Sequence, residues 1–253
     1  MCAEGVSRLG DSVKALIIAD GRVPPRSVLP EDLFGDVDLV VAADGGAERA
    51  AALGLRPDLV VGDGDSIDPD ALGALAASGT AVERYPAEKD ESDLELALKA
   101  AMVRGADEIV ILGALGGARF EHEMAAVALL GLEEASGREV IIADDLSTVR
   151  LLRGSERGGV VASLDVRGAP GDFVSILPWG GDATGVATEG LRYALRDEVL
   201  RMGPSRGLSN ELTVPTGRIS CRRGQLLVVH TRRSALLPAS SGNLIAPEGS
   251  HAS

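Results

Sequence analysis

Short apolar runs alternate with helical patterns through the first 150 residues of the chain. Strands are predicted by the apolar runs at residues 13–18, 38–43, 58–62, 81–85, 108–113 and 139–144. Helices are predicted by the alanine-rich or periodic segments at residues 47–53, 68–77, 92–103 and 121–135. Strands that alternate with helices in this way are typical of a parallel sheet covered on both faces. We therefore expect an N-terminal α/β domain with a parallel sheet.

The pattern changes after about residue 150. The rest of the chain consists of short β-like runs separated by Gly, Pro and Asp, with little helical periodicity. Such a pattern is typical of a β-sandwich. The predicted fold class is therefore an N-terminal parallel-sheet α/β domain, residues 1–153, followed by a C-terminal all-β sandwich domain, residues 154–237. Residues 238–253 are small and polar, and we expect them to form a flexible tail.

The chain has an excess of acidic residues, and this excess lies in its first part. The formal net charge is −13, although residues 151–253 carry slightly more Lys and Arg than Asp and Glu. An acidic surface repels phosphates, so we exclude nucleic acid as a partner of the whole chain. A small anionic ligand is compatible with this charge if divalent cations lie between the ligand and the carboxylates.

Cysteine content and hydropathy bear on the cellular setting. Cys2 and Cys221 are too few for a disulfide framework or a zinc cluster. No apolar run approaches the roughly 20 residues that span a bilayer, and the N-terminus lacks the pattern of a signal peptide. We therefore expect a cytoplasmic protein without a membrane partner.

Several kinds of catalytic chemistry lack their characteristic residues here. None of the lysines (Lys14, Lys89 and Lys99) lies in a G-x-x-x-x-G-K-[ST] phosphate-binding loop. No G-x-S-x-G sequence supports a serine hydrolase, and the few histidines leave little room for a histidine metal centre. Catalysis is therefore expected to use carboxylates, which act as magnesium ligands or as bases.

Acidic residues follow several of the predicted strands. Asp44 follows the second strand, Asp63 and Asp65 follow the third, and residues 88–93 hold further acids before a predicted helix. Ligands of open α/β sheets bind beyond the carboxyl ends of the strands, where these side chains are expected to meet. Because nearby carboxylates repel each other unless a cation or proton lies between them, the pattern indicates a cation site.

Each of these segments also has a simpler structural interpretation. Residues 63–66 are typical of a turn, and Asp90 or Ser92 can cap the helix that follows. The glycines at 113–117 either relax a turn or let backbone amides approach a phosphate beside Arg119. From the residues alone, both interpretations stay open.

Six segments, taken in order, resemble the thiamin pyrophosphokinase family. They are residues 44–47, 62–66, 89–98, 113–122, 188–195 and 207–211. They span most of the chain and are therefore more specific than any single motif. The resemblance implies an ATP-binding α/β domain, a β domain that closes the thiamin site, and a homodimer whose sites lie at the subunit interface.

The resemblance also implies a reaction and the residues that perform it. The pyrophosphoryl group of ATP is transferred to the thiamin hydroxyl, which gives thiamin diphosphate and AMP with Mg²⁺ as cofactor. Catalytic and metal-binding roles then belong to Asp63, Asp65 and Asp93, of which Asp93 is our preferred proton acceptor. The implied ATP-binding residues are Asp44, Lys89, Asp90, Ser92, Arg119 and His122, and the implied thiamin-binding residues are Ser209 and Asn210.

The chain departs from the family pattern mainly on the nucleotide side. Gly64 stands where a bulky residue is common, and Ala118 is inserted into a Gly-Gly-Arg sequence. Glu121 replaces an Asp, and Ala126 replaces an amide side chain in the following helix. These changes bear on nucleotide geometry more than on the metal site.

Two alternative functions and the roles of two side chains stay open at this point. A pyrophosphokinase for another alcohol, such as a pterin, would need the same ATP-binding half. A non-catalytic regulatory protein that binds thiamin or a nucleotide would explain Glu121 and Ala126, but it has less need of the full set of acids. His122 is either a nucleotide contact or a half-buried helix residue, and Tyr193 either stacks on thiamin or, as we prefer, packs in the β domain. The core is the expected place of Phe120 and Trp179.

Overall fold

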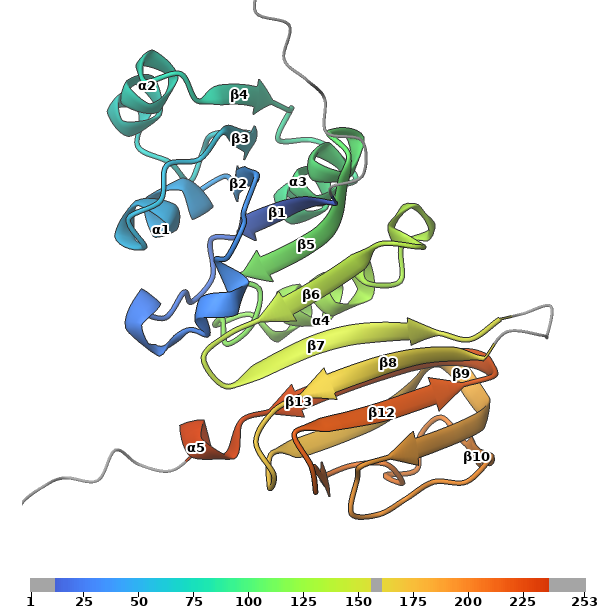
Figure 1. The fold of residues 1–253 in the computed structure, drawn as a ribbon. Helices are drawn as coiled ribbons and strands as arrows, with labels where there is room; N and C mark the ends of the chain where they lie inside the picture. The colour runs from blue at the N-terminus through green and yellow to red at the C-terminus, as the bar shows by residue number, and fades with distance from the viewer. Residues whose placement is uncertain (1–11, 156–160, 237–253) are drawn as a thin grey trace, which may run out of the picture.

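The computed structural model describes residues 12–155 and 161–236 (Figure 1). The first part contains β1 (Val13–Ile18), η1 (Arg26–Val28), η2 (Glu31–Leu33), β2 (Leu39–Ala43), α1 (Gly46–Ala52), β3 (Leu59–Gly62), α2 (Pro69–Ala77), β4 (Ala81–Arg84), α3 (Asp93–Val103), β5 (Ala106–Leu112), α4 (Phe120–Leu129), η3 (Glu133–Ala135) and β6 (Glu139–Ala143). The second part contains β7 (Ser147–Arg153), β8 (Ala162–Arg167), β9 (Phe173–Glu189), β10 (Glu198–Leu200), β11 (Asn210–Glu211), β12 (Thr216–Cys221), β13 (Arg223–Thr231) and α5 (Arg233–Leu236). Cys2 and the predicted tail, residues 238–253, lie outside the described residues.

A single sheet runs through both parts of the chain. Strands β4, β3, β2, β1, β5 and β6 lie side by side in this order and are parallel. Strand β7 pairs antiparallel with β6 and with β13, and β13 pairs in turn with β9 (Figure 1). The predicted parallel-sheet α/β architecture is therefore confirmed. The predicted boundary after residue 153 lies at the end of β7, inside this continuous sheet.

The strand order reverses direction at β1. The chain builds outward from β1 to β4 and then returns to place β5 on the other side of β1. Loops that leave two neighbouring strands in opposite directions separate at their carboxyl ends, which opens a crevice. The loops after β1 and β5 therefore border the expected ligand crevice.

The central parallel strands are apolar over most of their length because both of their faces are buried. In β1, Ala15 and Ile17 join the core beneath α3 and α4, whereas Leu16 and Ile18 join the core beneath α1, η1 and η2. Successive side chains of a strand point to opposite faces, so burial on both faces requires an unbroken apolar run. This explains why the sequence runs are so uniformly aliphatic.

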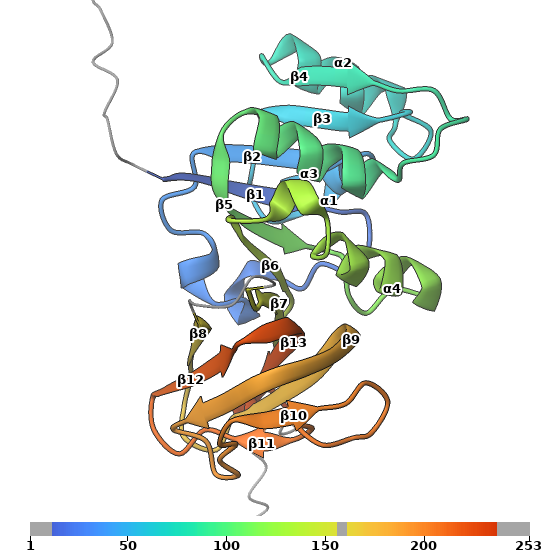
Figure 2. The ribbon, with the colours of Figure 1, turned by 90° about the vertical axis from the view of Figure 1, so that its right-hand side faces the viewer.

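Strands β7 and β13 also contribute apolar side chains to cores on both faces of the sheet. Val149 and Leu227 pack into the core beneath α3 and α4, while Leu152 and Leu226 pack into a separate core with Ile219 of β12. The second core lies between the main sheet and the layer formed by β8 and β12 (Figure 2). The predicted C-terminal β-sandwich is confirmed, and it shares its main sheet with the α/β part.

Several local predictions differ from the structure. Short β-like runs were expected after residue 150, but residues 173–189 form one long strand, β9. The helix predicted at 121–135 ends at Leu129, and η3 follows as a separate turn. Phe120 was expected in the core but is 73% exposed, because it starts α4 at the surface, whereas Trp179 does pack against the core. Across the described residues, every helix is too short or too polar to cross a membrane.

Gly46 begins α1 where that helix contacts the end of β1. A Cβ atom on Gly46 would lie 2.0 Å from the backbone oxygen of Ile18. We expect Gly46→Ala to lower the free energy of unfolding by about 3 kcal/mol, since overpacking against backbone cannot be relieved by a side-chain rotation. Urea denaturation measures this change.

The matched control is Gly73→Ala in α2, where an added Cβ would have no atom within 4 Å. This variant is expected to raise the free energy of unfolding by about 0.5–1 kcal/mol, because alanine is the better helix former. Equal effects of the two substitutions would contradict the close packing of α1 on β1.

Candidate active site

Three carboxylates meet at the carboxyl edge of the parallel sheet. Asp44 follows β2, Asp63 follows β3, and Asp93 is the first residue of α3. One oxygen of each side chain lies within 4.8 Å of the others. Asp44 and Asp63, which follow strands, and Asp93, from the acidic segment at the start of a helix, therefore lie together as expected.

Asp44 organises the loop that follows β3. Its side chain is buried, and its backbone has a φ of 46°, a left-handed conformation that Asp adopts more readily than most residues. Its two carboxylate oxygens accept hydrogen bonds from the amides of Gly64, at 3.1 Å, and Ser66, at 3.0 Å. Asp44 thus holds the 63–66 segment against the end of β2, and both its oxygens are already engaged by amides.

Lys89 supplies positive charge between the other two acids. Its Nζ atom lies 3.0 Å from Oδ1 of Asp93 and 3.6 Å from Oδ2 of Asp63. The contact with Asp93, together with the charge of Asp63, raises the pKa of Lys89. The amide of Asp65 and, more weakly, Lys89 hold the pKa of Asp63 below its ordinary value, although burial acts in the opposite direction. Asp63 and Lys89 are therefore both charged at neutral pH.

This group of residues fits a divalent cation. Among the described residues, the buried Oδ1 atom of Asp93 has no partner with hydrogen-bond geometry, despite its ion pair with Lys89. A single lysine leaves three carboxylates with a net negative charge. Carboxylate oxygens are the ligands that Mg²⁺ prefers, and a divalent cation would relieve the repulsion between Asp44, Asp63 and Asp93.

Asp65 lies beside this cluster and is not one of its three members. Its side chain is exposed and accepts a hydrogen bond from Oγ of Ser66 at 2.9 Å. Its amide donates to Oδ1 of Asp63 at 3.1 Å. The structure thus shows Asp65 supporting Asp63 through the backbone, and a metal-binding role for its carboxylate stays a prediction.

The segment before α3 provides both a helix cap, Ser92, and an acidic residue of the cluster, Asp93. Ser92 is the N-cap residue of α3, and its Oγ accepts a hydrogen bond from the amide of Glu95 at 3.2 Å. The cap places Asp93 in the first turn of the helix, directly beside Lys89. Asp90 is exposed. The capping interpretation of Ser92 is therefore confirmed, and the same cap fixes the position of an acidic residue of the cluster.

The glycine-rich turn leads into the N-terminus of α4. Arg119 and His122 are both exposed, so the half-buried alternative for His122 is wrong. Arg119 pairs with Glu121 at 2.7 Å, and both side chains face solvent. Ala126 is buried against the core beneath α3 and α4, so this departure from the family pattern is filled by packing.

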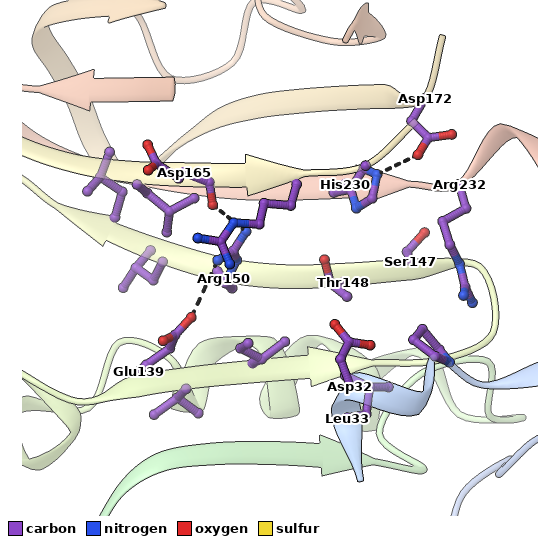
Figure 3. Close-up of a pocket in the computed structure, with 18 of the residues that line it drawn as sticks. Asp32, Leu33, Glu139, Ser147, Thr148, Arg150, Asp165, Asp172, His230 and Arg232 are labelled. Atoms are coloured by element: carbon purple, nitrogen blue, oxygen red, sulfur yellow. Dashed lines mark hydrogen bonds and ion pairs between the residues drawn. The ribbon is translucent and has the colours of Figure 1, made fainter. Parts of the chain in front are cut away.

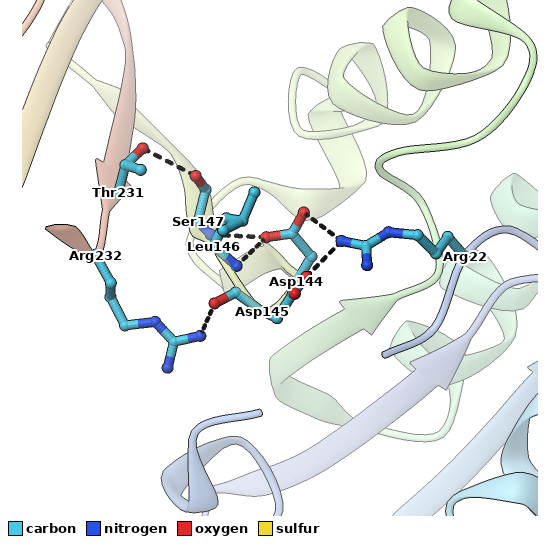
Figure 4. Close-up of polar contacts among 7 residues, drawn as sticks. All are labelled: Arg22, Asp144, Asp145, Leu146, Ser147, Thr231 and Arg232. Atoms are coloured by element: carbon cyan, nitrogen blue, oxygen red, sulfur yellow. Dashed lines mark hydrogen bonds and ion pairs between the residues drawn. The ribbon is translucent and has the colours of Figure 1, made fainter. Parts of the chain in front are cut away.

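Two residues at the strand-order reversal were not predicted as site residues. Asp20 follows β1; burial raises its pKa, the charges of Asp44 and Glu48 add to this rise, and Arg49 opposes it. Arg22 lies further along the same loop and binds Asp144 and Asp145 in the turn after β6 (Figure 4). Asp20 had a sequence signal, since it ends a strand as Asp44 does, but the pairing of Arg22 had none.

The predicted thiamin-binding residues lie in the β-sandwich. Ser209 is exposed and has a φ of 53°. Asn210 is buried, and its side chain holds Tyr193 by accepting from its amide at 2.9 Å and donating to its carbonyl at 2.8 Å. Tyr193 is 60% exposed, so the expected packing of this ring is wrong. Figures 1 and 2 place this region at the opposite end of the molecule from β3 and its acids.

Two family models match the chain in order. One, described as thiamin pyrophosphokinase, catalytic domain, matches residues 30–142, and the other, described as thiamin pyrophosphokinase, vitamin B1 binding domain, matches residues 163–226. The thiamine pyrophosphokinase of Bacillus subtilis (strain 168) is 27% identical over 218 residues, which are 85% of this chain and 97% of that protein. Thiamine pyrophosphokinase 1 of Arabidopsis thaliana is 28% identical over 217 residues, which are 78% of each chain.

Solved structures share the fold over nearly their whole length. The thiamine pyrophosphokinase structure from Bacillus subtilis superimposes with a TM-score of 0.72 and 25% identity, covering 87% of this chain and 99% of that one. The thiamin pyrophosphokinase structure from Geobacillus thermodenitrificans gives a TM-score of 0.71 and 28% identity, covering 89% and 100%. The similarity therefore includes both the α/β part and the β-sandwich.

Asp93→Asn tests whether the three carboxylates hold a divalent cation. A cation at a hundred times its Kd stabilises the folded state by about 2.7 kcal/mol, so Mg²⁺ should raise the thermal unfolding temperature of the wild-type chain. Asp93→Asn removes one anionic ligand, and we expect most of this rise to disappear. The control is Asp70→Asn, the same charge change on an exposed residue of α2. A full Mg²⁺ effect in Asp93→Asn, or its loss in Asp70→Asn, would contradict the assignment.

Proposed function

This chain belongs to the thiamin pyrophosphokinase family, and we propose that it transfers the pyrophosphoryl group of ATP to the hydroxyl of thiamin. The products are thiamin diphosphate and AMP. The observation that carries this proposal is that the catalytic and the vitamin B1 binding models match the two parts of the chain in the family's order. The cluster of Asp44, Asp63 and Asp93 at the carboxyl edge of the sheet supports it.

The reaction needs alignment and charge neutralisation more than covalent help from the protein. The hydroxyl oxygen of thiamin bonds to the β-phosphorus of ATP, the bond from that phosphorus to the oxygen bridging to the α-phosphate breaks, and AMP leaves with that oxygen. The hydroxyl proton passes to a carboxylate. We assign this step to Asp93, because its buried Oδ1 atom has no hydrogen-bond partner among the described residues apart from its ion pair with Lys89.

Metal binding is assigned to Asp63, Asp65 and Asp93, with Asp44 beside them. Mg²⁺, when bound, would neutralise charge between the carboxylates and the triphosphate. Asp44 contributes by holding the 63–66 segment in place through the amides of Gly64 and Ser66. Asp65 is exposed, so its carboxylate is free to turn toward a cation at this edge.

The remaining predicted residues are assigned to ATP. Lys89 lies next to the carboxylates, and its ammonium is positioned to contact phosphate oxygens once a divalent cation replaces it as the partner of Asp63 and Asp93. Arg119 is exposed at the start of α4 and needs only to leave Glu121 to contact the nucleotide. Asp90 and Ser92 lie with Lys89 in the segment before α3, and His122 lies with Arg119 at the start of α4.

A homodimer would complete the thiamin site. Strand β11, which begins with Asn210 directly after Ser209, lies at the opposite end of the molecule from β3 (Figures 1 and 2), and this supports a site shared with the acids of a second copy. Asn210 would act by holding Tyr193 and the loop, since its side-chain amide is already used within the sandwich. We propose that this dimer acts in the cytoplasm on the small molecules ATP and thiamin, without nucleic acid or membrane partners.

The identity of the nucleotide product tests the reaction directly. The purified chain is incubated with Mg²⁺, ATP and thiamin, and the products are separated by chromatography. AMP and thiamin diphosphate are expected in equal amounts. ADP as the product would contradict pyrophosphoryl transfer, and transfer to a pterin alcohol but not to thiamin would identify a different acceptor. Tight binding without turnover would indicate a regulatory protein.

Asp65→Asn tests the metal role of Asp65 and, by subunit mixing, the shared site. Alone, this variant is expected to lose turnover by about a hundredfold or more, because an essential ligand for charge neutralisation is gone. Its unfolding curve should match wild type, since the Asp65 carboxylate is exposed. Near-wild-type rates would contradict the metal role.

The mixing partner is Ser209→Lys, which would place a cation against the positively charged thiazolium ring of thiamin. If each site takes its acids from one subunit and Ser209 from the other, randomly mixed dimers have about a quarter of their sites intact. Mixing the two inactive variants should therefore restore about that share of the wild-type rate. No recovery after confirmed subunit exchange would place both residues in a site built within one chain.

A further inference from the structure

A large groove lies where the two layers that cover one face of the sheet fail to meet. The face of β1 and β5 that bears Leu16 and Leu112 is covered by α1, η1 and η2, and the corresponding face of β13 and β9 is covered by β8 and β12. Between them, the same face of β6 and β7 borders a cavity of about 1020 Å³ (Figure 3). Asp44, Asp63 and Asp93 do not line it, so it is separate from the proposed active site.

The floor of this groove carries a largely buried guanidinium group. Arg150 extends from β7, and its side chain is 16% exposed. It donates to the backbone oxygen of Asp165 at 3.0 Å, and its nearest carboxylate, that of Glu139, is 3.4 Å away and mostly exposed (Figure 3). Burial lowers the pKa of Arg150, which is the sign of a charge whose lost hydration is poorly replaced.

A second arginine adds to the positive charge. Arg167, at the end of β8, lines the same groove, and its charge also lowers the pKa of Arg150. The charge of Asp165 acts on Arg150 in the opposite direction, but the Asp165 carboxylate is hydrogen-bonded to Arg218 at 2.7 and 3.1 Å. Two guanidinium groups therefore act on one cavity while the nearest acid of β8 is engaged elsewhere.

The other acids of the groove leave this charge largely in place. Asp172 is buried and paired with His230 at 3.0 Å, and Asp144 is held by Arg22 and by backbone amides. Asp32 is exposed, and Glu139, which pairs with Arg150 at 3.4 Å, is mostly exposed, so solvent screens its charge.

The rest of the lining suits the body of a small molecule. Thr148 contributes a hydroxyl group, and Leu33, Leu146 and Leu164 contribute apolar surface. A cavity of this size lies at the upper end of the range found for small-molecule sites, which combine apolar walls with a few convergent polar groups.

We propose that this groove binds a small molecule bearing a phosphate or diphosphate group, with Arg150 and Arg167 contacting that group. Paired guanidinium groups bind planar or tetrahedral oxyanions through several charge-assisted hydrogen bonds. Two arginines suit a multiply charged phosphate better than a single carboxylate. A phosphate here would replace the hydration that Arg150 has lost.

Binding without metal separates this site from the active site. In EDTA, the acids of the active site repel anions, whereas the groove needs no cation, so the test is independent of the proposed function. Isothermal titration calorimetry is carried out in EDTA with inorganic pyrophosphate and, in a parallel series, with citrate as a carboxylate probe. Saturable binding of pyrophosphate at one site per chain is expected, with citrate binding more weakly.

Three variants assign that binding to the groove. Arg167→Gln should weaken it by about tenfold or more, the loss expected for a hydrogen bond to a charged group, and Arg150→Gln by at least as much. Arg222→Gln is the matched control, because Arg222 is exposed and paired with Asp197 away from the groove. If Arg150→Gln fails to fold, Arg167→Gln decides, since Arg167 makes no ion pair among the described residues.

The proposal is overturned by any of three results. These are no saturable pyrophosphate binding by the wild-type chain, unchanged binding in Arg167→Gln, or citrate binding more tightly than pyrophosphate.

Discussion

The repulsion among three carboxylates within 4.8 Å of one another is the constraint on which the carboxyl edge of this sheet depends. The fold meets it in three ways. Asp44 is bound by the amides of Gly64 and Ser66, Lys89 lies between Asp63 and Asp93, and the Ser92 cap fixes the start of α3. These contacts hold the acids in place but leave net negative charge. We propose that a divalent cation completes the balance, which would allow an acidic protein to bind a polyanion such as ATP.

The sheet that positions these acids also joins the two halves of the molecule. Strands β7 and β13 bury one face beneath α3 and α4, and on the other face Leu152 and Leu226 pack inside the β-sandwich. The two parts are therefore built on one framework, and a change at the β6–β7 turn bears on both. Arg22 connects this turn to the loop after β1, and Arg232 binds it from the end of β13 (Figure 4). The groove with Arg150 lies beside this junction.

Much of the fold could be predicted because the strands are buried on both faces and so appear as unbroken apolar runs. The acids could be found because they directly follow these apolar runs, and parallel strands bring their carboxyl ends to one edge of the sheet. The exposure of Phe120 could not, because an aromatic residue at the first position of a helix carries no sign of which way it faces. Nor could the position of Arg150 and Arg167 in one groove, which depends on how β8 folds over β7. The sequence also does not show whether Asp44 or Asp65 joins Asp63 and Asp93 in the cluster, because the direction of the Asp44 side chain depends on its φ.

We propose that Asp63 and Asp93, with Asp44 beside them, surround a divalent cation. Crystals grown with Mn²⁺ and a non-hydrolysable ATP analogue test it by anomalous diffraction at the manganese edge. We expect an anomalous peak between Oδ atoms of Asp63 and Asp93 at about 2.0–2.3 Å from each, with Lys89 turned away from Asp93. The phosphates of the analogue should lie on the far side of the metal. An ordered nucleotide with no peak at these residues, or with Lys89 still between them, would show that these acids do not bind the cation.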